Sequence, residues 1–147
     1  MARRMFSPAI VCDDSFIDMP TSSQALYFQL GMNADDDGFV SPKKIMRMVG
    51  AGEDDLKILL GKRYAIPFES GVIVIRHWKV NNLVRKDWYR PSVHQLEKAL
   101  IQPDQSGTYH LVNELTPSSV TQVGSKVVNN KAPFKKIKPP NIVKRMS

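Results

Sequence analysis

Two segments with helical patterning are joined by only three residues, Gly50-Ala51-Gly52, and so short a link leaves few possible folds. Ser41 and Pro42 are typical of a helix start, because serine caps a first turn and proline fits the first helical position. Gly50 is suited to end that helix. The second segment opens with three acids at 53–55, which favour the positive end of a helix dipole. Two short helices joined by a tight glycine-containing turn are typical of a helix-turn-helix.

The flanking segments extend this pattern into a small mixed domain. A preceding helix is predicted from an apolar face through Leu26 and Leu30. Residues 39–40 allow only a short strand, whereas 64–68 and 72–75 predict a hairpin. The order helix, short strand, helix, turn, helix, hairpin predicts an α+β, mainly helical fold with a winged helix-turn-helix domain. Other small α+β domains share that order.

Composition divides the chain into three zones. We expect residues 1–80 to form the winged-helix domain and residues 81–102 to be a basic connector with a helix. Residues 103–147 hold five prolines and little clustered apolar surface, which predicts a flexible, largely disordered tail.

The net charge of +7 lies entirely at the C-terminal end of the chain. Residues 126–147 carry seven Lys or Arg and no acid, while residues 1–125 hold 14 charges of each sign. Such a tail suits nucleic-acid phosphate, an anionic membrane surface or an acidic protein, or serves solubility alone. We favour DNA.

Several kinds of chemical site are excluded by the residues themselves. Residues 33–38 match the first half of a calcium loop, but Lys44 stands where the closing carboxylate is required. We therefore expect a polar turn whose Asp side chains accept backbone hydrogen bonds. Residues 50–55 lack the third glycine of a dinucleotide fingerprint. One cysteine and three widely spaced histidines predict no catalytic residue, no metal site, no cofactor and no small-molecule substrate.

Hydropathy gives no sign of a membrane partner. No apolar run approaches the roughly 20 residues that a spanning helix needs. The N-terminal residues have no apolar core of signal-peptide length. We therefore expect a cytoplasmic protein.

The richest nucleic-acid candidate is the stretch 76–90, with five Lys or Arg, one acid and three aromatic residues. Asn81 and Asn82 offer groups for base edges. Trp78 and Trp88 are better explained as core or docking residues, because each buries a large area.

The acids at 53–55 would repel phosphate at the N-terminus of a recognition helix, so DNA contacts are expected on several other surfaces. The predicted DNA-binding residues are Lys43, Lys44, Arg47, Lys57, Lys62, Arg63, Arg76, Lys79, Arg85, Lys86, Arg90, Lys135, Lys136 and Lys138. Glu53, Asp54 and Asp55 are assigned instead to a basic protein partner.

Several runs in the first hundred residues resemble a known family. They are 1–7 (MARRMFS), 16–20 (FIDMP), 24–28 (QALYF), 34–40 (ADDDGFV) and 71–78 (GVIVIRHW). In this order they are similar to the N-terminal region of replisome-organiser, or replication-initiation, proteins of phages and prophages of Gram-positive bacteria. The resemblance implies a winged-helix domain that recognises a phage origin and recruits helicase-loading proteins in the bacterial host cell. It assigns no DNA contact to an individual residue.

The sequence therefore predicts a non-enzymatic, phage-type DNA-binding protein of replication initiation, with host or phage replication proteins as partners. Two alternatives stay open. One is a phage interaction protein that inhibits or adapts a host nucleic-acid machine, and the other is a transcriptional regulator.

Overall fold

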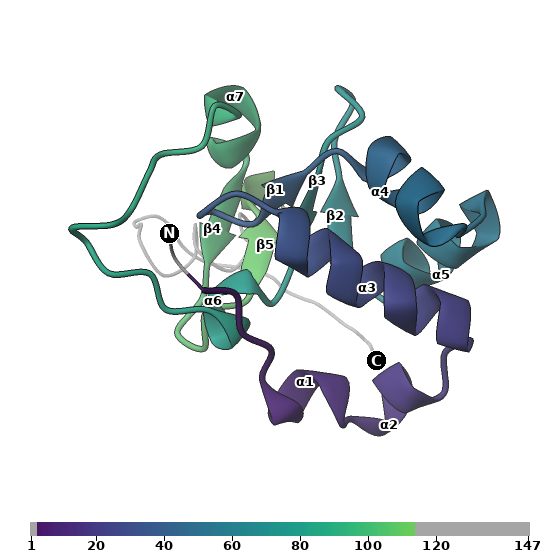
Figure 1. The fold of residues 1–147 in the computed structure, drawn as a ribbon. Helices are drawn as coiled ribbons and strands as arrows, with labels where there is room; N and C mark the ends of the chain where they lie inside the picture. Colours follow the sequence, from purple (N-terminus) through teal and green to yellow (C-terminus); the bar gives the residue numbers. More distant parts are fainter. Residues whose placement is uncertain (1–2, 114–147) are drawn as a thin grey trace, which may run out of the picture. The chain divides into compact units, whose positions relative to one another are not determined.

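The computed structural model describes residues 3–113 (Figure 1). Residues 1–110 form one compact unit, and the chain from residue 111 onward belongs to a second. The helices are α1 (Pro8–Val11), α2 (Asp14–Ile17), α3 (Thr21–Asn33), α4 (Pro42–Val49), α5 (Glu53–Gly61), α6 (Trp78–Asn81) and α7 (Gln95–Lys98). The strands are β1 (Phe39–Val40), β2 (Ala65–Pro67), β3 (Ile73–Ile75), β4 (Ile101–Pro103) and β5 (Tyr109–Leu111). The described chain is an α+β fold, as predicted.

Helix α3 is the central element of the first unit. It contacts α4, α5 and β1 and buries Leu26, Tyr27 and Leu30 completely. The Tyr27 ring meets the edges of Phe16 and Tyr64, with centroids 5.2 and 5.8 Å apart. Burial raises the pKa of the Tyr27 hydroxyl to about 12. The predicted apolar face through Leu26 and Leu30 is therefore the core face.

Three short strands form an antiparallel sheet in the order β1-β3-β2. The middle strand, β3, is buried along its whole length, which explains its continuous β-branched sequence. Pro67 lies on β2, at an edge, as expected for a residue that cannot donate to a ladder. Gly71, at φ 91°, allows the tight turn between β2 and β3.

The helix pair at the predicted link is present. Gly50 ends α4 with φ 71°, in the left-handed region, and the Ala51 amide donates to the Met46 carbonyl at 2.9 Å. Pro42 occupies the first turn of α4, as predicted. The predicted cap by Ser41 was wrong, because its side chain makes no capping hydrogen bond.

The predicted boundary of the flexible zone at residue 103 was also wrong. Strand β5 lies within that zone and pairs with β4, which ends at residue 103, and Tyr109 is buried. Its hydroxyl donates to the Asp37 carbonyl at 2.9 Å, and its amide donates to the Arg76 carbonyl at 2.8 Å. The compact unit therefore continues past the predicted domain end at residue 80. The rest of the predicted tail, from residue 114, lies outside the described residues.

Candidate nucleic-acid interface

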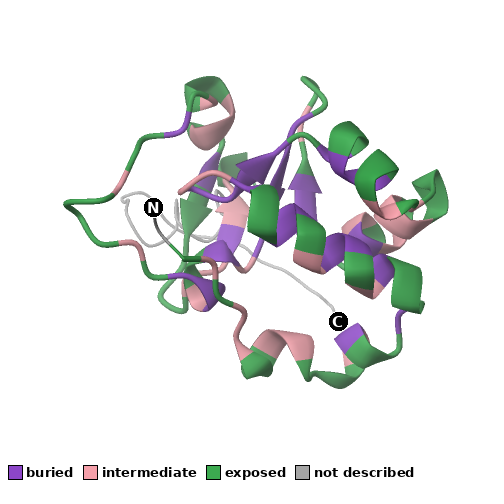
Figure 2. Cartoon of the chain, viewed as in Figure 1, coloured by how far each residue is buried: buried purple, intermediate pink, exposed green. Residues whose placement is uncertain are grey.

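Helix α4 presents one basic face. Lys43, Lys44 and Arg47 are exposed, whereas Ile45 and Met46 are buried against the body (Figure 2). The helix contains no acid. Within residues 3–113 these three cations form no ion pair with a carboxylate. The α4 basic face, defined by these three side chains, thus concentrates positive charge on one side of a single helix.

The N-terminus of α5 adjoins this face. A shallow hollow of about 320 Å³ is lined by residues of both helices, including Lys43, Arg47 and Glu53. Glu53 and Asp54 are exposed. Phosphate that approaches the α4 basic face closely would therefore also meet negative charge at its border.

Asp55 was predicted to bind a partner, but its carboxylate is engaged within the fold. Its Oδ2 accepts from the Gly52 amide at 2.9 Å and its Oδ1 from the Ser22 hydroxyl at 2.5 Å. These hydrogen bonds, that of Ser22 first, lower the pKa of Asp55 below its ordinary 3.8. Asp55 therefore caps α5 and ties it to the start of α3, and its assignment to a partner site is not supported.

The remaining cations of the α5 region have mixed surroundings. Lys57 is exposed. Lys62 is exposed but donates from Nζ to the Ser15 carbonyl at 3.0 Å. Arg63 is exposed and has φ 67°, a left-handed backbone that closes the turn after α5. Only Lys57 therefore resembles the α4 cations in offering its charge entirely to solvent.

Arg76 was predicted to contact DNA, but its side chain is buried in the described structure. The residue is 7% exposed, and its Nη2 lies 3.1 Å from Nδ1 of His110. His110 in turn meets Asp104 through Nε2 at 2.8 Å. The hydrogen bonds at its carboxylate hold the pKa of Asp104 well below its usual range. The side chain of Arg76 thus serves the packing of the β4–β5 region.

The polar residues of α6 also serve the fold. Asn81 and Asn82 are buried, and their Oδ1 atoms accept from the amides of Ser7 and Met5 at 2.8 and 2.7 Å. They fasten the N-terminal segment to the end of α6, so their Oδ1 atoms are used within the fold rather than offered to base edges. Trp78 is a core residue, as expected, with its indole nitrogen donating to the Asp36 carbonyl at 2.9 Å.

Residues 83–94 form a long and mostly exposed loop. Lys79, just before it, and Arg85, Lys86 and Arg90 are exposed. Arg85 is not free for phosphate, because it pairs with Asp87 at 2.8 Å. The cations of α4 and those of the loop lie far from each other. Figure 1 shows α4 at one end of the three-stranded sheet and this loop beyond the other.

The acidic turn at 35–37 holds the loop in place. Asp36 accepts from the Arg90 amide at 2.9 Å, and Asp37 accepts from the Ser92 amide at 3.1 Å. Asp37 also accepts from the Tyr89 hydroxyl, at 2.8 and 2.9 Å to its two oxygens. The expectation of a polar turn with hydrogen-bonded Asp side chains is confirmed for Asp35, whose Oδ1 accepts from the amides of Asp37 and Phe39.

Two further residues complete this network. Lys98 donates to the Tyr89 hydroxyl at 2.8 Å and lies 3.3 Å from Asp37. The hydrogen bond to Tyr89 raises the pKa of Lys98, and burial raises that of Tyr89. Arg4 pairs with Asp36 at 3.1 Å. These partners could not be predicted from the sequence, because they lie more than 30 residues away from the turn and local patterning carries no signal for them.

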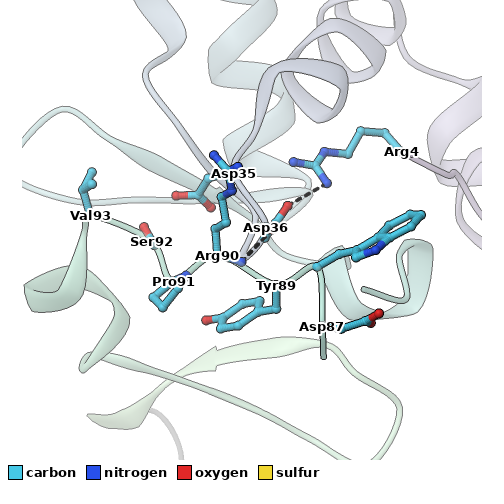
Figure 3. A pocket seen from close by; sticks show the side chains of 10 residues that line it. Arg4, Asp35, Asp36, Asp87, Tyr89, Arg90, Pro91, Ser92 and Val93 are labelled. Atoms are coloured by element: carbon cyan, nitrogen blue, oxygen red, sulfur yellow. Dashed lines mark hydrogen bonds and ion pairs between the residues drawn. The ribbon is translucent and has the colours of Figure 1, made fainter. Parts of the chain in front are cut away.

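A hollow of about 670 Å³ opens between this turn and the loop (Figure 3). Its lining is mixed in charge and includes aromatic rings. The lining residues are Arg4, Asp35, Asp36, Asp87, Trp88, Tyr89, Arg90, Pro91, Ser92 and Val93.

Three further findings bear on chemistry and location. Among residues 3–113, no three His, Cys, Asp or Glu side chains gather closely enough to hold a metal ion. None of the helices in this part of the chain has the length and apolarity that a bilayer crossing requires. The predicted DNA contacts Lys135, Lys136 and Lys138 lie outside the described residues.

Comparison with protein-family models, with curated proteins and with solved structures found no match to this chain.

Proposed function

We propose that the chain is a non-enzymatic DNA-binding protein with a winged-helix body, in which the α4 basic face contacts duplex phosphates. The observation that carries the proposal is this face. Three exposed cations on one helix, with no acid among them, are suited to successive phosphates. Such contacts position a protein on DNA without reading its sequence.

The order and pairing of the elements support the winged-helix assignment. Helix α3, strand β1 and the pair α4 and α5 are followed by the β2–β3 hairpin. Strand β1 pairs with β3, so the hairpin and the helix pair belong to one body. In this interpretation α5 is the recognition helix and the turn at 68–71 is the tip of the wing.

The distribution of charge favours α4 over α5 and the wing as the phosphate-binding element. The N-terminus of α5 carries the exposed acids Glu53 and Asp54. The turn at 68–71 carries Glu69 and no Lys or Arg. DNA held by α4 would therefore lie against the preceding helix of the pair, with α5 entering the groove less deeply than in an ordinary helix-turn-helix.

The resemblance to phage replisome organisers supports a role in replication initiation, with origin DNA and helicase-loading proteins as partners in the host cytoplasm. The exposed acids Glu53 and Asp54 also favour a second candidate, an interaction protein that docks a basic surface of a host nucleic-acid machine. Transcriptional regulation would use the same DNA contacts. These three roles differ in their partners. Replication initiation and transcriptional regulation would both use the α4 contact with DNA, whereas the interaction protein would not require it.

The test replaces the α4 basic face. Lys43→Gln, Lys44→Gln and Arg47→Gln are combined, and duplex binding is measured by fluorescence anisotropy over a salt series. We expect the slope of log affinity against log salt to become less steep by about 2.7, since each of the three lost phosphate contacts contributes about 0.9. Affinity at about 0.1 M salt should fall roughly tenfold for each phosphate that is no longer neutralised.

A matched variant removes the same charge elsewhere. Lys57→Gln, Lys79→Gln and Lys86→Gln replace three exposed cations outside α4. We expect a clearly smaller change in slope, with thermal unfolding unchanged in both triple variants. Equal effects of the two triples would show that charge alone matters, and no effect of the α4 triple would overturn the proposal.

A further inference from the structure

We infer that the hollow beside the loop at 83–94 binds an unstacked base of single-stranded DNA, with Trp88 as the stacking surface. This site lies apart from the α4 basic face, and the inference rests on the proposed function only for the choice of DNA as ligand. The hollow, at about 670 Å³, is large enough for a nucleoside. A base inside a duplex is stacked and paired, so only a single strand can deliver one.

Trp88 differs from the other tryptophan of the chain in its exposure. Trp78 is 2% exposed, whereas Trp88 is 49% exposed and lines the hollow. The Arg85 guanidinium lies 4.8 Å from the Trp88 ring centroid and is itself paired with Asp87. The guanidinium lies over one face of the ring, and about half of the residue remains open to a ligand. Stacking on such a ring is available to every base.

The loop that carries Trp88 is fixed on its C-terminal side. The Arg90 amide, the Ser92 amide and the Tyr89 hydroxyl all bond to the acidic turn, as described above. These contacts hold the backbone that directly follows Trp88, so the loop loses little freedom when a base stacks on the ring. The cost of ordering the site is therefore small, which favours binding.

One polar group of the wall has unused hydrogen-bonding capacity. Arg4 is committed to the fold, because its Nη1 lies 3.1 Å from Asp36 in an ion pair and its Nη2 donates to the Ala34 carbonyl at 2.8 Å. Asp35 uses Oδ1 for two backbone amides, and no described residue donates to its Oδ2. Figure 3 shows both side chains at the same hollow.

The free oxygen of Asp35 predicts a preference among bases. A carboxylate oxygen accepts from an exocyclic amine. Cytosine, adenine and guanine carry such an amine, and thymine does not. Arg90, exposed at the rim, and Lys86 nearby on the loop are placed to meet the flanking phosphates.

The test uses the full chain and single-stranded oligonucleotides of about 12 nucleotides, within the usual site sizes. Intrinsic tryptophan fluorescence reports on the site, because Trp88 is the exposed one of two tryptophans. We expect oligo-dC to quench the emission and to bind more tightly than oligo-dT. Trp88→Ala should weaken oligo-dC binding at least about fivefold, and Trp88→Phe should weaken it less.

The matched control is Leu83→Ala, which removes a fully solvated apolar side chain of the same loop that does not line the hollow. It should leave oligo-dC binding and quenching unchanged. Asp35→Asn should reduce the preference for oligo-dC over oligo-dT, with thermal unfolding measured to show that the fold is retained.

Three results would overturn the inference. They are the absence of quenching by any single strand, equal binding by Trp88→Ala and the unaltered chain, and a preference for oligo-dT. The α4 triple variant separates this site from the proposed function. It should lose duplex binding yet keep the preference for oligo-dC. If the α4 triple variant lost duplex binding and no single strand quenched the tryptophan emission, the proposed function would stand and the base site would be refuted.

Discussion

Two runs of three acids, at 35–37 and 53–55, have similar sequences and opposite surroundings. In the first run Asp37 is 3% exposed and accepts hydrogen bonds from Tyr89 and Ser92. In the second run Glu53 and Asp54 face solvent. The first run joins distant parts of the chain, while the second mainly sets the electrostatic potential beside the α4 basic face. The role of an acidic cluster can therefore be assigned only once its neighbours in space are known.

The difference follows from where the two runs lie. The run at 35–37 is a turn between α3 and β1, and the loop at 83–94 crosses it and brings hydrogen-bond donors. The run at 53–55 is the first turn of a helix, where backbone amides and the helix dipole already stabilise negative charge. A buried carboxylate needs partners, and a solvated one does not.

The largest expected effect is on stability, from Asp37→Ala. The change leaves the Tyr89 hydroxyl and the Ser92 amide without their acceptor in a buried site. We expect the free energy of unfolding to fall by about 3 kcal/mol. Chemical denaturation followed by circular dichroism measures it. Asp54→Ala is the control and should change the value by no more than about 0.5 kcal/mol. A decrease for Asp37→Ala no larger than the control's would contradict the role given to the first run.

A smaller effect, dependent on pH, is expected from Asp55→Asn. Because the folded-state pKa of Asp55 lies below its ordinary 3.8, its charge contributes stability above that pH. The contribution is lost as the pH falls through the folded pKa. The melting temperature of the variant should thus be lower than that of the unaltered chain near neutral pH. The difference should disappear well below pH 3.8, and a difference independent of pH would rule out the ionised carboxylate as its cause.

The smallest effect is expected from the double change Glu53→Gln and Asp54→Asn. Removing two exposed acids beside the α4 basic face should raise duplex affinity about threefold, since exposed charges interact weakly. Anisotropy at low salt measures this change, and the gain should shrink at high salt. Unchanged or weaker duplex binding would indicate that DNA does not approach the border between α4 and α5.

Much of the fold could be predicted from local sequence. The link at 50–52, the proline start of α4 and the edge position of Pro67 each depend on backbone chemistry that one or two residues determine. The β4–β5 sheet could not be predicted in this way. Its strands are three residues long, and the burial of Tyr109 depends on Asp37 and Arg76, which lie far away in the sequence.

The candidate site was predicted only in part. The α4 cations stand on the solvent face of a helix whose period is visible in the sequence, so their exposure could be expected. Arg76, Asn81 and Asn82 looked equally suitable as DNA contacts and proved to be buried. Polar residues near the end of a strand carry no local signal that separates a core hydrogen bond from a surface contact.

The helix pair, the hairpin and the charge of α4 follow from local sequence, because they depend on residues within one turn or one strand of each other. Tertiary packing governs which acids are buried acceptors, which tryptophan stays open and where a hollow forms. Those outcomes depend on donors from the loop at 83–94 meeting a turn some fifty residues earlier. Only the packing of the whole unit brings the two together.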